Sequence, residues 1–435
     1  MEEEVFFDYN KEPGEEENSI KMPEDTKPII SIITSYYKSN QYIEQTYNCI
    51  VSQTFPYWEW IIVDDGSDNK EAIELIEKIE KRDSRIHVYH KENEGLAKGR
   101  DYAISKASTE YIFPLDADDL IEKTMLECSY FAMLCFPEAT WAYSNIVGFG
   151  SMKYLDCREF DINRMKTDNQ ITATALIKKE KILELGGYGK AERYINEDWH
   201  LWLRMLQKRY FPIHMHFYGL WYRRKETGSL LKEINNPNNP NNTLRIEALK
   251  QEADKINSNV NAIELPGSQI DTIVTINCDD WKKIYQGDNI LIIVKALKTD
   301  THVLEIVKRE KEKHITILTS EGYLNIGRQW YEDYAEIFDM QTFLSTHGQK
   351  EFISYIIKTR SISKVYVCNE PNFSSVLDDK VEVIVDNYIE DESKYIEYKK
   401  RYEFNKSIVG KIIKKIKRGK EKLNGRLYNK SGRCE

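Results

Sequence analysis

The sequence predicts an α/β protein with two sheets, the first of them mostly parallel and covered by helices on both faces. Short apolar, β-branched runs alternate with segments of helical periodicity, which is the pattern of strands joined by crossover helices. The pattern occurs twice, and the Asn- and Pro-rich residues 235–242 separate the two occurrences. A chain of 435 residues is long enough for two domains of ordinary size. We therefore expect a larger first domain and a smaller second α/β module.

The first half of the chain contains four expected strands and three expected helices. The strands are rich in isoleucine, valine and aromatic residues, which favour extended backbone. The helices carry apolar residues at spacings of three and four, which place one face of each helix on a core. The expected strands are residues 29–33, 60–63, 86–89 and 111–113, and the expected helices are 42–52, 72–79 and 96–106.

The second module is expected to contain strands at residues 289–294, 315–318, 364–367 and 381–385, and helices at 303–312 and 352–359. A short helix over residues 244–257 is expected to follow the Asn- and Pro-rich break. These elements predict an acidic flexible tail (1–27), a first domain (28–232), a linker with a helix (233–262), a second module (263–390) and a basic amphipathic tail (391–435).

Composition argues against several classes of protein. A net charge of −9 is atypical of a general nucleic-acid binder, which needs a basic surface, so no nucleic-acid partner is expected. The apolar runs are far shorter than the roughly 20 residues that span a bilayer, and no apolar segment follows Met1, so we expect no secretory signal. Seven dispersed cysteines without a C-x-x-C pair fit a cytoplasmic protein without a cysteine-based structural zinc site.

The C-terminal segment has the opposite charge to the rest of the chain. Residues 406–435 contain eleven basic and two acidic residues, and apolar side chains recur there at helical spacing, namely Val409, Ile412, Ile413 and Ile416. A basic amphipathic helix can lie on an anionic membrane surface, which predicts peripheral association at the inner membrane face. A helix that binds a partner protein and a solvated tail are the alternatives.

Two acidic clusters end expected strands in the first half. Asp64 and Asp65 follow strand 60–63, and Asp116 and Asp118 follow strand 111–113. The carboxyl ends of parallel strands meet at one edge of a sheet, which is where ligands bind. Carboxylates two residues apart on an extended segment point the same way and can flank one hard cation. An ordinary Asp-Gly turn and a helix cap are the structural alternatives.

A third acidic pair, Glu197 and Asp198, opens an expected amphipathic helix. A helix N-terminus favours negative charge for structural reasons, and a carboxylate in a cleft can also act as a general base. His214 and His216 are predicted to share one face of a strand, and we interpret them as ordinary strand residues.

In this order and spacing, the motifs resemble those of glycosyltransferase family 2 over about residues 28–230. The most specific matches are residues 53–55, 60–67, 115–119 and 197–204. The resemblance implies a GT-A nucleotide-sugar-binding domain. It also implies an inverting transferase that moves a sugar from a nucleotide-sugar donor, UDP-linked by expectation, to a hydroxyl group of a glycan or lipid-linked acceptor.

The resemblance also implies roles for individual residues. Asp118 would hold Mn²⁺ or Mg²⁺ between the phosphates, and Asp198 would be the general base, with Glu197 positioning the acceptor or the base. Trp199, which is next to the base, would offer a ring face to the acceptor. The nucleotide would be bound by Thr34, Tyr36 stacking on the base, Asp64, Asp65 at the base edge, Arg100 and Asp116 at the ribose.

The chain departs from the family pattern at three places. Tyr37 follows Tyr36 where asparagine is common, and Asp101 follows Arg100 where asparagine is common. Lys225 stands near the position where a histidine often helps to bind the metal or the phosphates. The central acids are kept, and the third metal ligand is left open.

Residues 285–390 bear a weaker resemblance to the N-terminal half of GT-B glycosyltransferases. The strand 289–294 is followed by Lys298 and Thr299, but Asp300 and Thr301 replace the usual pair of glycines. The resemblance implies a Rossmann-like module without catalysis of its own, which would bind an acceptor, a partner or a second copy of the chain. For the whole protein, a non-catalytic scaffold for glycan assembly and a nucleotidyltransferase are the alternatives. The latter would need a glycine-rich loop that residues 34–37 lack.

Overall fold

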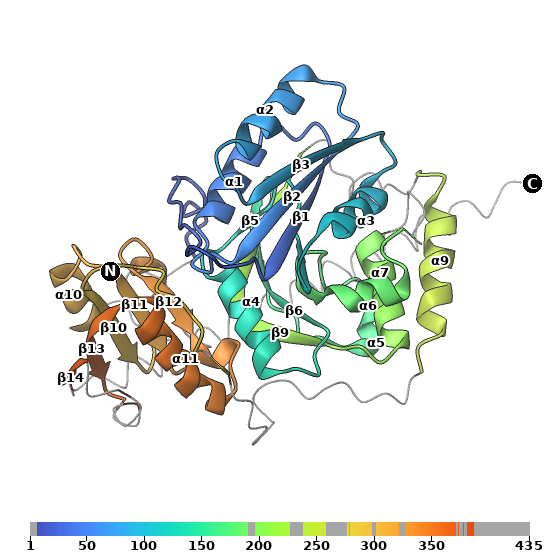
Figure 1. The fold of residues 1–435 in the computed structure, drawn as a ribbon. Helices are drawn as coiled ribbons and strands as arrows, with labels where there is room; N and C mark the ends of the chain where they lie inside the picture. The colour runs from blue at the N-terminus through green and yellow to red at the C-terminus, as the bar shows by residue number, and fades with distance from the viewer. Residues whose placement is uncertain are drawn as a thin grey trace, which may run out of the picture.

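The computed structural model describes residues 7–189, 196–226, 238–257, 276–277, 279–297, 302–321 and 328–370, together with positions 373, 377 and 381–386. Figure 1 shows two α/β domains side by side, which confirms the predicted class. The first domain contains a mixed sheet of nine strands and the second a sheet of five parallel strands. The predicted basic tail, residues 391–435, lies outside the described residues.

The first sheet has the strand order β3-β2-β1-β4-β8-β6-β9-β5, with β7 paired to β6. Its parallel half consists of the four strands that the sequence predicts, β1 (Ile30–Tyr36), β2 (Trp58–Asp65), β3 (Ile86–Lys91) and β4 (Tyr111–Pro114). The other half, in which β6 and β9 run parallel to each other, comprises β5 (Leu120–Ile121), β6 (Trp141–Gly150), β7 (Tyr154–Asp156), β8 (Leu176–Lys178) and β9 (Pro212–Arg224).

Helices pack on both faces of this sheet (Figure 1). One face is covered by α1 (Ile43–Val51), α2 (Lys70–Glu80) and α4 (Met125–Cys135). The other face is covered by α3 (Leu96–Lys106), α5 (Ile162–Met165), α6 (Lys179–Leu185), α7 (Glu197–Gln207) and α9 (Asn242–Asp254). The last of these is the short helix expected after the Asn- and Pro-rich break. The two faces are buried in separate apolar cores.

The second sheet has the order β12-β11-β10-β13-β14, and all of its strands are parallel. Its strands are β10 (Asn289–Val294), β11 (Ile315–Thr319), β12 (Glu336–Asp339), β13 (Ile362–Cys368) and β14 (Glu382–Asp386). Its helices are α10 (His302–Arg309) and α11 (Thr346–Thr359), with short 3-10 turns at Arg328–Trp330 and Met340–Thr342. The sequence predicts all of these strands except β12.

The two domains share a buried core. Glu127 on α4 accepts hydrogen bonds from the Tyr355 hydroxyl at 2.6 Å and from an Arg360 guanidinium nitrogen at 2.7 Å. The same guanidinium pairs with Glu336 on β12 at 3.0 Å, and all of these groups are buried. Phe131 on α4 packs edge-on against Phe352 of α11, with ring centroids 4.8 Å apart. Because one apolar cluster runs through α4 and α11, the second domain covers part of the first domain's surface.

The N-terminal segment differs from its prediction. Its acidic composition predicted a flexible tail, yet residues 7–27 pack against both domains. The Phe7 ring lies 5.5 Å from that of Trp221 in the first domain, and the Lys11 ammonium pairs with Asp333 in the second at 2.8 Å. The Ile20 amide donates to the Val51 carbonyl at 2.8 Å. The contacts of Phe7 and Ile20 with the first domain therefore hold this segment in place despite its acidic composition.

Among the described residues, none of the helices has both the length and the apolar character required to cross a bilayer.

Candidate active site

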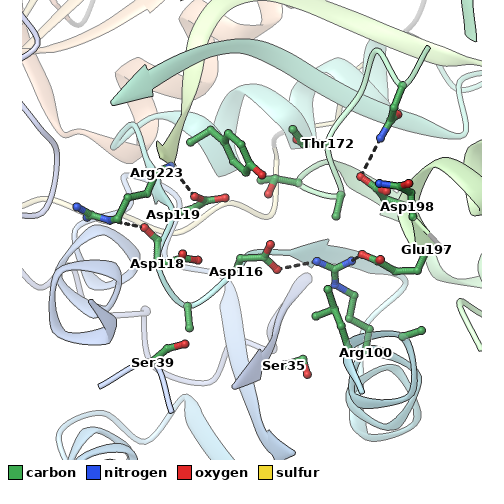
Figure 2. Close-up of a pocket in the computed structure, with 18 of the residues that line it drawn as sticks. Ser35, Ser39, Arg100, Asp116, Asp118, Asp119, Thr172, Glu197, Asp198 and Arg223 are labelled. Atoms are coloured by element: carbon green, nitrogen blue, oxygen red, sulfur yellow. Dashed lines mark hydrogen bonds and ion pairs between the residues drawn. The ribbon is translucent and has the colours of Figure 1, made fainter. Parts of the chain in front are cut away.

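A cavity of about 930 Å³ opens at the carboxyl ends of β1, β2 and β4. This is the edge at which the acidic clusters were expected, and the volume is in the range of small-molecule sites. Figure 2 shows its acidic and basic side chains facing one another across the cavity. The charged residues of its lining are Asp65, Glu94, Lys98, Arg100, Asp116, Asp118, Asp119, Asp156, Arg158, Glu197, Asp198, Arg223, Arg224 and Lys225.

Arg100, on α3, ties two acidic segments together at the base of the cavity. Its guanidinium donates to Asp116 Oδ1 at 2.6 Å and to Glu197 Oε1 (Figure 2). The side chain is almost completely buried, which opposes its charge, but the carboxylates of Asp116 and Glu197 raise the pKa of the guanidinium above its usual value. Arg100 thereby fixes the start of α7 relative to the loop after β4.

Two neighbouring carboxylates at the start of α7 have different surroundings. The pKa of Glu197 is raised to about 7 in all, mainly by burial. Arg100 opposes this shift, and the charge of Asp198 adds to it. Burial also raises the pKa of Asp198, whose oxygens accept from Asn169 Nδ2 at 3.0 Å and from the Trp199 amide at 2.7 Å. Since Glu197 is committed to Arg100, Asp198 is the better placed of the two to take a proton from a ligand.

The loop after β4 meets cationic groups at the end of β9. Lys225 Nζ pairs with an oxygen of Asp118, and the Arg223 amide donates to Asp119 Oδ1 at 2.8 Å. Burial raises the pKa of Asp118, and the neighbouring charge of Asp116 adds to the shift, while Lys225 opposes it. Crowded carboxylates of this kind are stabilised by an added positive charge.

The oxygen donors of Asp116 and Asp118 fit a hard divalent cation such as Mn²⁺ or Mg²⁺. Lys225 contacts Asp118 in the structure, so a cation would compete with the ammonium group for that carboxylate. Six of the residues predicted from the sequence thus lie together at this cavity, namely Asp65, Arg100, Asp116, Asp118, Glu197 and Asp198.

Three predicted nucleotide-binding residues do not reach the cavity. Thr34 donates to the Leu115 carbonyl at 2.7 Å and is fully buried. The hydroxyl of Tyr36, also fully buried, donates to the Ala72 carbonyl of α2 at 3.2 Å. Asp64 accepts from the Ser67 amide at 3.0 Å and contacts His90. The prediction of direct ligand contact is therefore wrong for these residues, which instead support the edge of the sheet from within.

The aromatic residue that does line the cavity beside β1 is Tyr37. Its side chain is 46% exposed. Successive side chains of a strand point to opposite faces, so Tyr37 turns away from the core that Tyr36 enters. The stacking ring predicted at Tyr36 is therefore corrected to Tyr37, the neighbouring tyrosine that lines the cavity.

Asp65 lines the cavity and also holds the following loop. Its carboxylate accepts from Lys91 Nζ at 2.8 Å and from the amides of Gly95 at 2.7 Å and Glu94 at 3.1 Å. The next residue must be glycine: Gly66 has φ +76°, and a Cβ there would lie 2.7 Å from the Asn93 nitrogen. The Asp-Asp-Gly sequence thus brings the 93–95 loop to the cavity wall.

Trp199 is not placed as an acceptor platform. Its indole N–H donates to the Met165 carbonyl at 2.7 Å, and its ring packs against the apolar core beside α7. That prediction is wrong because the Trp199 ring packs on this core and does not line the cavity. The aromatic rings in the lining are those of Tyr37, Tyr154 and Tyr222, and the last two were missed.

Part of the chain is similar in sequence to known proteins. Residues 31–151 match the model of Glycosyl transferase family 2. TuaG of Bacillus subtilis (strain 168), named as a glycosyltransferase of teichuronic acid biosynthesis, is 42% identical over 102 residues, which are 23% of this chain and 40% of TuaG. EpsJ of the same organism, named as an uncharacterized glycosyltransferase, is 29% identical over 184 residues, 42% of this chain and 49% of EpsJ. The chain thus spans less than half the length of these relatives.

A crystal structure of S. aureus TarS in complex with UDP-GlcNAc is similar to this chain with a TM-score of 0.40 and 18% identity, over 47% of this chain and 60% of that one.

Proposed function

Because residues 31–151 match the model of glycosyltransferase family 2, we propose that this chain transfers a sugar from a nucleotide-diphosphate donor to an acceptor hydroxyl, with inversion at the anomeric carbon. The main support for this proposal is that the groups suited to the diphosphate and the candidate base lie on separate sides of one cavity. Asp118 and Arg223 lie on one side of the cavity, and Asp198 and Glu197 lie on the other (Figure 2). Inversion needs such a division, since the leaving group and the base act on opposite faces of the sugar.

The side with Arg223 and Lys225 suits the leaving diphosphate. Breaking the bond between sugar and diphosphate leaves negative charge on the phosphates, and fixed cations stabilise that charge in the transition state. Lys225 can pass from Asp118 to a phosphate oxygen, and Arg224 adds a second charge at the same wall. A divalent cation held by Asp118, with Asp116 beside it, would add Lewis-acid stabilisation when bound.

Asp198 is the proposed base. It would take the proton of the acceptor hydroxyl as the bond to the anomeric carbon forms. Its raised pKa makes it a stronger base than an exposed aspartate, and Asn169 and the Trp199 amide fix its orientation. Glu197 would act indirectly, by keeping Arg100 in place.

Asp65 and Tyr37 line the nucleotide side of the cavity in this proposal. Asp65 would meet the base edge, Tyr37 would stack on the ring, and Asp116 would meet the ribose. We propose a UDP-linked donor and a glycan or lipid-linked acceptor. The name of TuaG, which refers to a bacterial polysaccharide, supports the class of acceptor. Action at the cytoplasmic face of a membrane is part of the same proposal.

The test is transfer from a panel of nucleotide sugars with Mn²⁺ or Mg²⁺, in which the released nucleotide and the anomeric configuration of the product are measured. Asp118→Asn should weaken binding of metal and donor, because a neutral amide replaces an anionic ligand. Asp68→Asn is a suitable control, since Asp68 is exposed and its carboxylate pairs with Lys38 at 2.7 Å on the surface. Donor binding without transfer to any acceptor would favour the non-catalytic scaffold, and a product with retained configuration would contradict inversion.

A further inference from the structure

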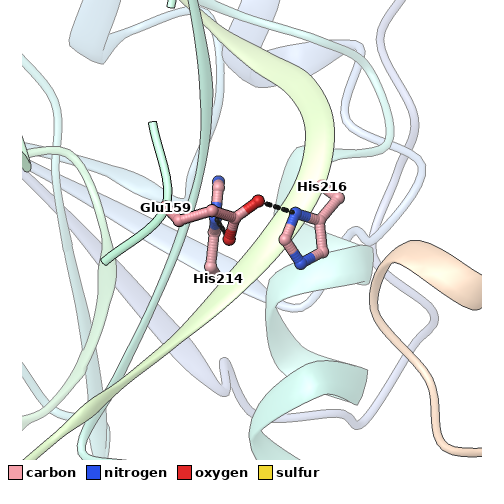
Figure 3. A group of neighbouring side chains, drawn as sticks. All are labelled: Glu159, His214 and His216. Atoms are coloured by element: carbon pink, nitrogen blue, oxygen red, sulfur yellow. Dashed lines mark hydrogen bonds and ion pairs between the residues drawn. The ribbon is translucent and has the colours of Figure 1, made fainter. Parts of the chain in front are cut away.

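A second group of ligand-type side chains lies away from the charged cavity. His214 and His216 belong to β9, and Glu159 lies in the loop between β7 and α5. One nitrogen of each histidine and one carboxylate oxygen all lie within 4.8 Å of one another. Figure 3 shows the three side chains converging at the edge of β9.

Strand β9 is irregular where the two histidines lie. Along β6, Tyr143 pairs with His214 and Ser144 with Met215, but Asn145 pairs with Tyr218. His216 and Phe217 are therefore extra residues in β9, as in a β-bulge, which changes the direction of side chains. The two imidazole rings come to 4.3 Å between centroids, with their planes tilted by 51°.

The surroundings of His214 resemble those of a metal ligand. Its Nε2 lies 2.8 Å from Asn145 Oδ1, and the Tyr143 ring stacks on it at 4.5 Å. A ligating histidine usually donates its other N–H to an oxygen in this way, which fixes the ring orientation. With the hydrogen on Nε2, the lone pair of Nδ1 faces Glu159 Oε2 at 3.3 Å. Two electron pairs so placed repel each other, and a cation between them turns the repulsion into attraction.

The distances and ligand types agree on one class of ion. Bonds of about 2.0–2.1 Å in a tetrahedral site place neighbouring ligand atoms about 3.3 Å apart. Glu159 Oε2 lies 3.3 Å from His214 Nδ1, and the other carboxylate oxygen, Oε1, lies 3.6 Å from His216 Nδ1. Two imidazoles and one carboxylate suit zinc and related ions, whereas Mg²⁺ prefers oxygen ligands. The Glu159 side chain is 52% exposed, which leaves a path for the ion, while both histidines are nearly buried.

We propose that Glu159, His214 and His216 bind a divalent transition metal of the zinc class, at a site separate from Asp118. The ion would fasten the loop between β7 and α5 to β9. That loop also carries Arg158, which lines the charged cavity and donates to Asp156 at 2.8 Å. Metal binding would therefore stiffen one wall of the cavity. This proposal does not depend on the proposed transferase activity.

The experiment uses the full chain, stripped of metal with a chelator and titrated with Zn²⁺ by calorimetry in the absence of nucleotide. We expect a site that His216→Ala removes and that Glu159→Gln weakens by at least about tenfold, the lower end of losses at supporting residues of metal sites. Co²⁺ bound to the same site should give visible absorption bands that both variants lose. His87→Ala, on β3, is the matched control and should bind Zn²⁺ as the wild type does.

Glu159→Gln changes one partly exposed side chain by a single group, so it keeps the test valid if a histidine variant fails to fold; circular dichroism checks the fold of each. Asp118→Asn should retain the Zn²⁺ site, which separates a failure here from a failure of the donor-site proposal. Absence of Zn²⁺ binding by the wild type would overturn the proposal. Unchanged binding by His216→Ala and Glu159→Gln would overturn it as well, and a shared proton would then explain the contact with Glu159.

Discussion

Asp198 lies beside Glu197 at the start of α7, but only Asp198 is free of the ion pair with Arg100. We expect Asp198→Asn to lower kcat by about 10²–10⁴-fold, because an amide cannot accept the acceptor's proton. Binding of the donor should change little, since Asp198 faces the acceptor side in the proposed arrangement. Steady-state kinetics together with calorimetry of donor binding would measure both effects. Turnover near that of the wild type would reject Asp198 as the base, and Glu197 would be tested next.

The adjacent residues Tyr36 and Tyr37 give a paired test of nucleotide stacking. Tyr37→Ala should weaken donor binding by about 1–3 kcal/mol, the usual contribution of one base stacked on an aromatic ring. Tyr36→Phe should leave donor binding unchanged and cost about 1 kcal/mol of folding stability, because only its hydrogen bond to the Ala72 carbonyl is lost. Equal losses of donor affinity in both variants would contradict the assignment.

The same pair shows what could be predicted at the residue scale. The motifs predicted the acids and the arginine of the cavity because strand ends and a helix start bring them there. The alternation of side chains along β1 could also have been predicted from the sequence, since Ile30, Ile32 and Tyr36 share the face that enters one core. The contact between Asp118 and Lys225 could not be predicted from the sequence, because it depends on where β9 ends relative to the loop after β4.

At the scale of elements, a partly buried acid follows the short pairing of β5 with β9. Just after β5, Glu122 accepts from Trp221 Nε1 at 2.7 Å, and its amide donates to the Gly219 carbonyl at 2.9 Å. Burial raises the pKa of Glu122 to about 7, and Glu332 adds to the shift. The native chain therefore holds a proton that the unfolded chain releases above its ordinary pKa of 4.5, so this contribution to stability is lost as the pH rises through about 7.

Glu122→Gln should accordingly stabilise the protein near pH 8 by about 1–3 kcal/mol and much less near pH 5. The glutamine oxygen can still accept the hydrogen bond from Trp221. Unfolding by denaturant at the two pH values measures the difference. Glu74→Gln, on the exposed side of α2, should show no such pH dependence. An effect of equal size at both pH values would refute the role of burial.

The sequence predicted elements well where the residue pattern was strong and poorly where pairing decided the structure. The strands β1, β2 and β10 each contain a buried run rich in isoleucine. In contrast, β12 is four residues long, and two of them are acidic: Glu336 meets Arg360, and Asp339 meets Arg328. Since charged side chains are rarely buried unless they are paired, the tertiary ion pairs explain this strand.

At the scale of the molecule, Arg360 links the two domains. Arg360→Met leaves Glu127 buried without this cation and leaves Glu336 to pair with His314, which we expect to cost about 3–5 kcal/mol of unfolding free energy. Arg82→Met removes an exposed pair with Glu44 and should cost less than about 1 kcal/mol. Denaturant unfolding followed by both tryptophan fluorescence and circular dichroism compares the two variants. A loss for Arg360→Met as small as that for Arg82→Met would show that the shared core does not depend on this ion pair.

The basic segment 406–435 lies outside the described residues and remains a prediction. We expect the full chain to bind vesicles containing anionic lipids, with about 1 kcal/mol for each basic residue near the surface. Binding should weaken in high salt because the charges are screened. Sedimentation with anionic and neutral vesicles measures the effect, and a chain cut before residue 406 is the control. Equal sedimentation with both vesicle types would count against a membrane role.

The shared core has a consequence for comparisons with proteins that match only residues 31–151 of this chain. Helix α4 lies inside that segment, yet Glu127 and Phe131 on it face the second domain. In a protein with this segment but without the second domain, an acid at the first position would lack the Arg360 cation, and a ring at the second would lack the cover of α11. We therefore expect different residues at these two positions in such proteins. A chimera that exchanges the second domain would need a redesigned face of α4, because this face is buried against the second domain.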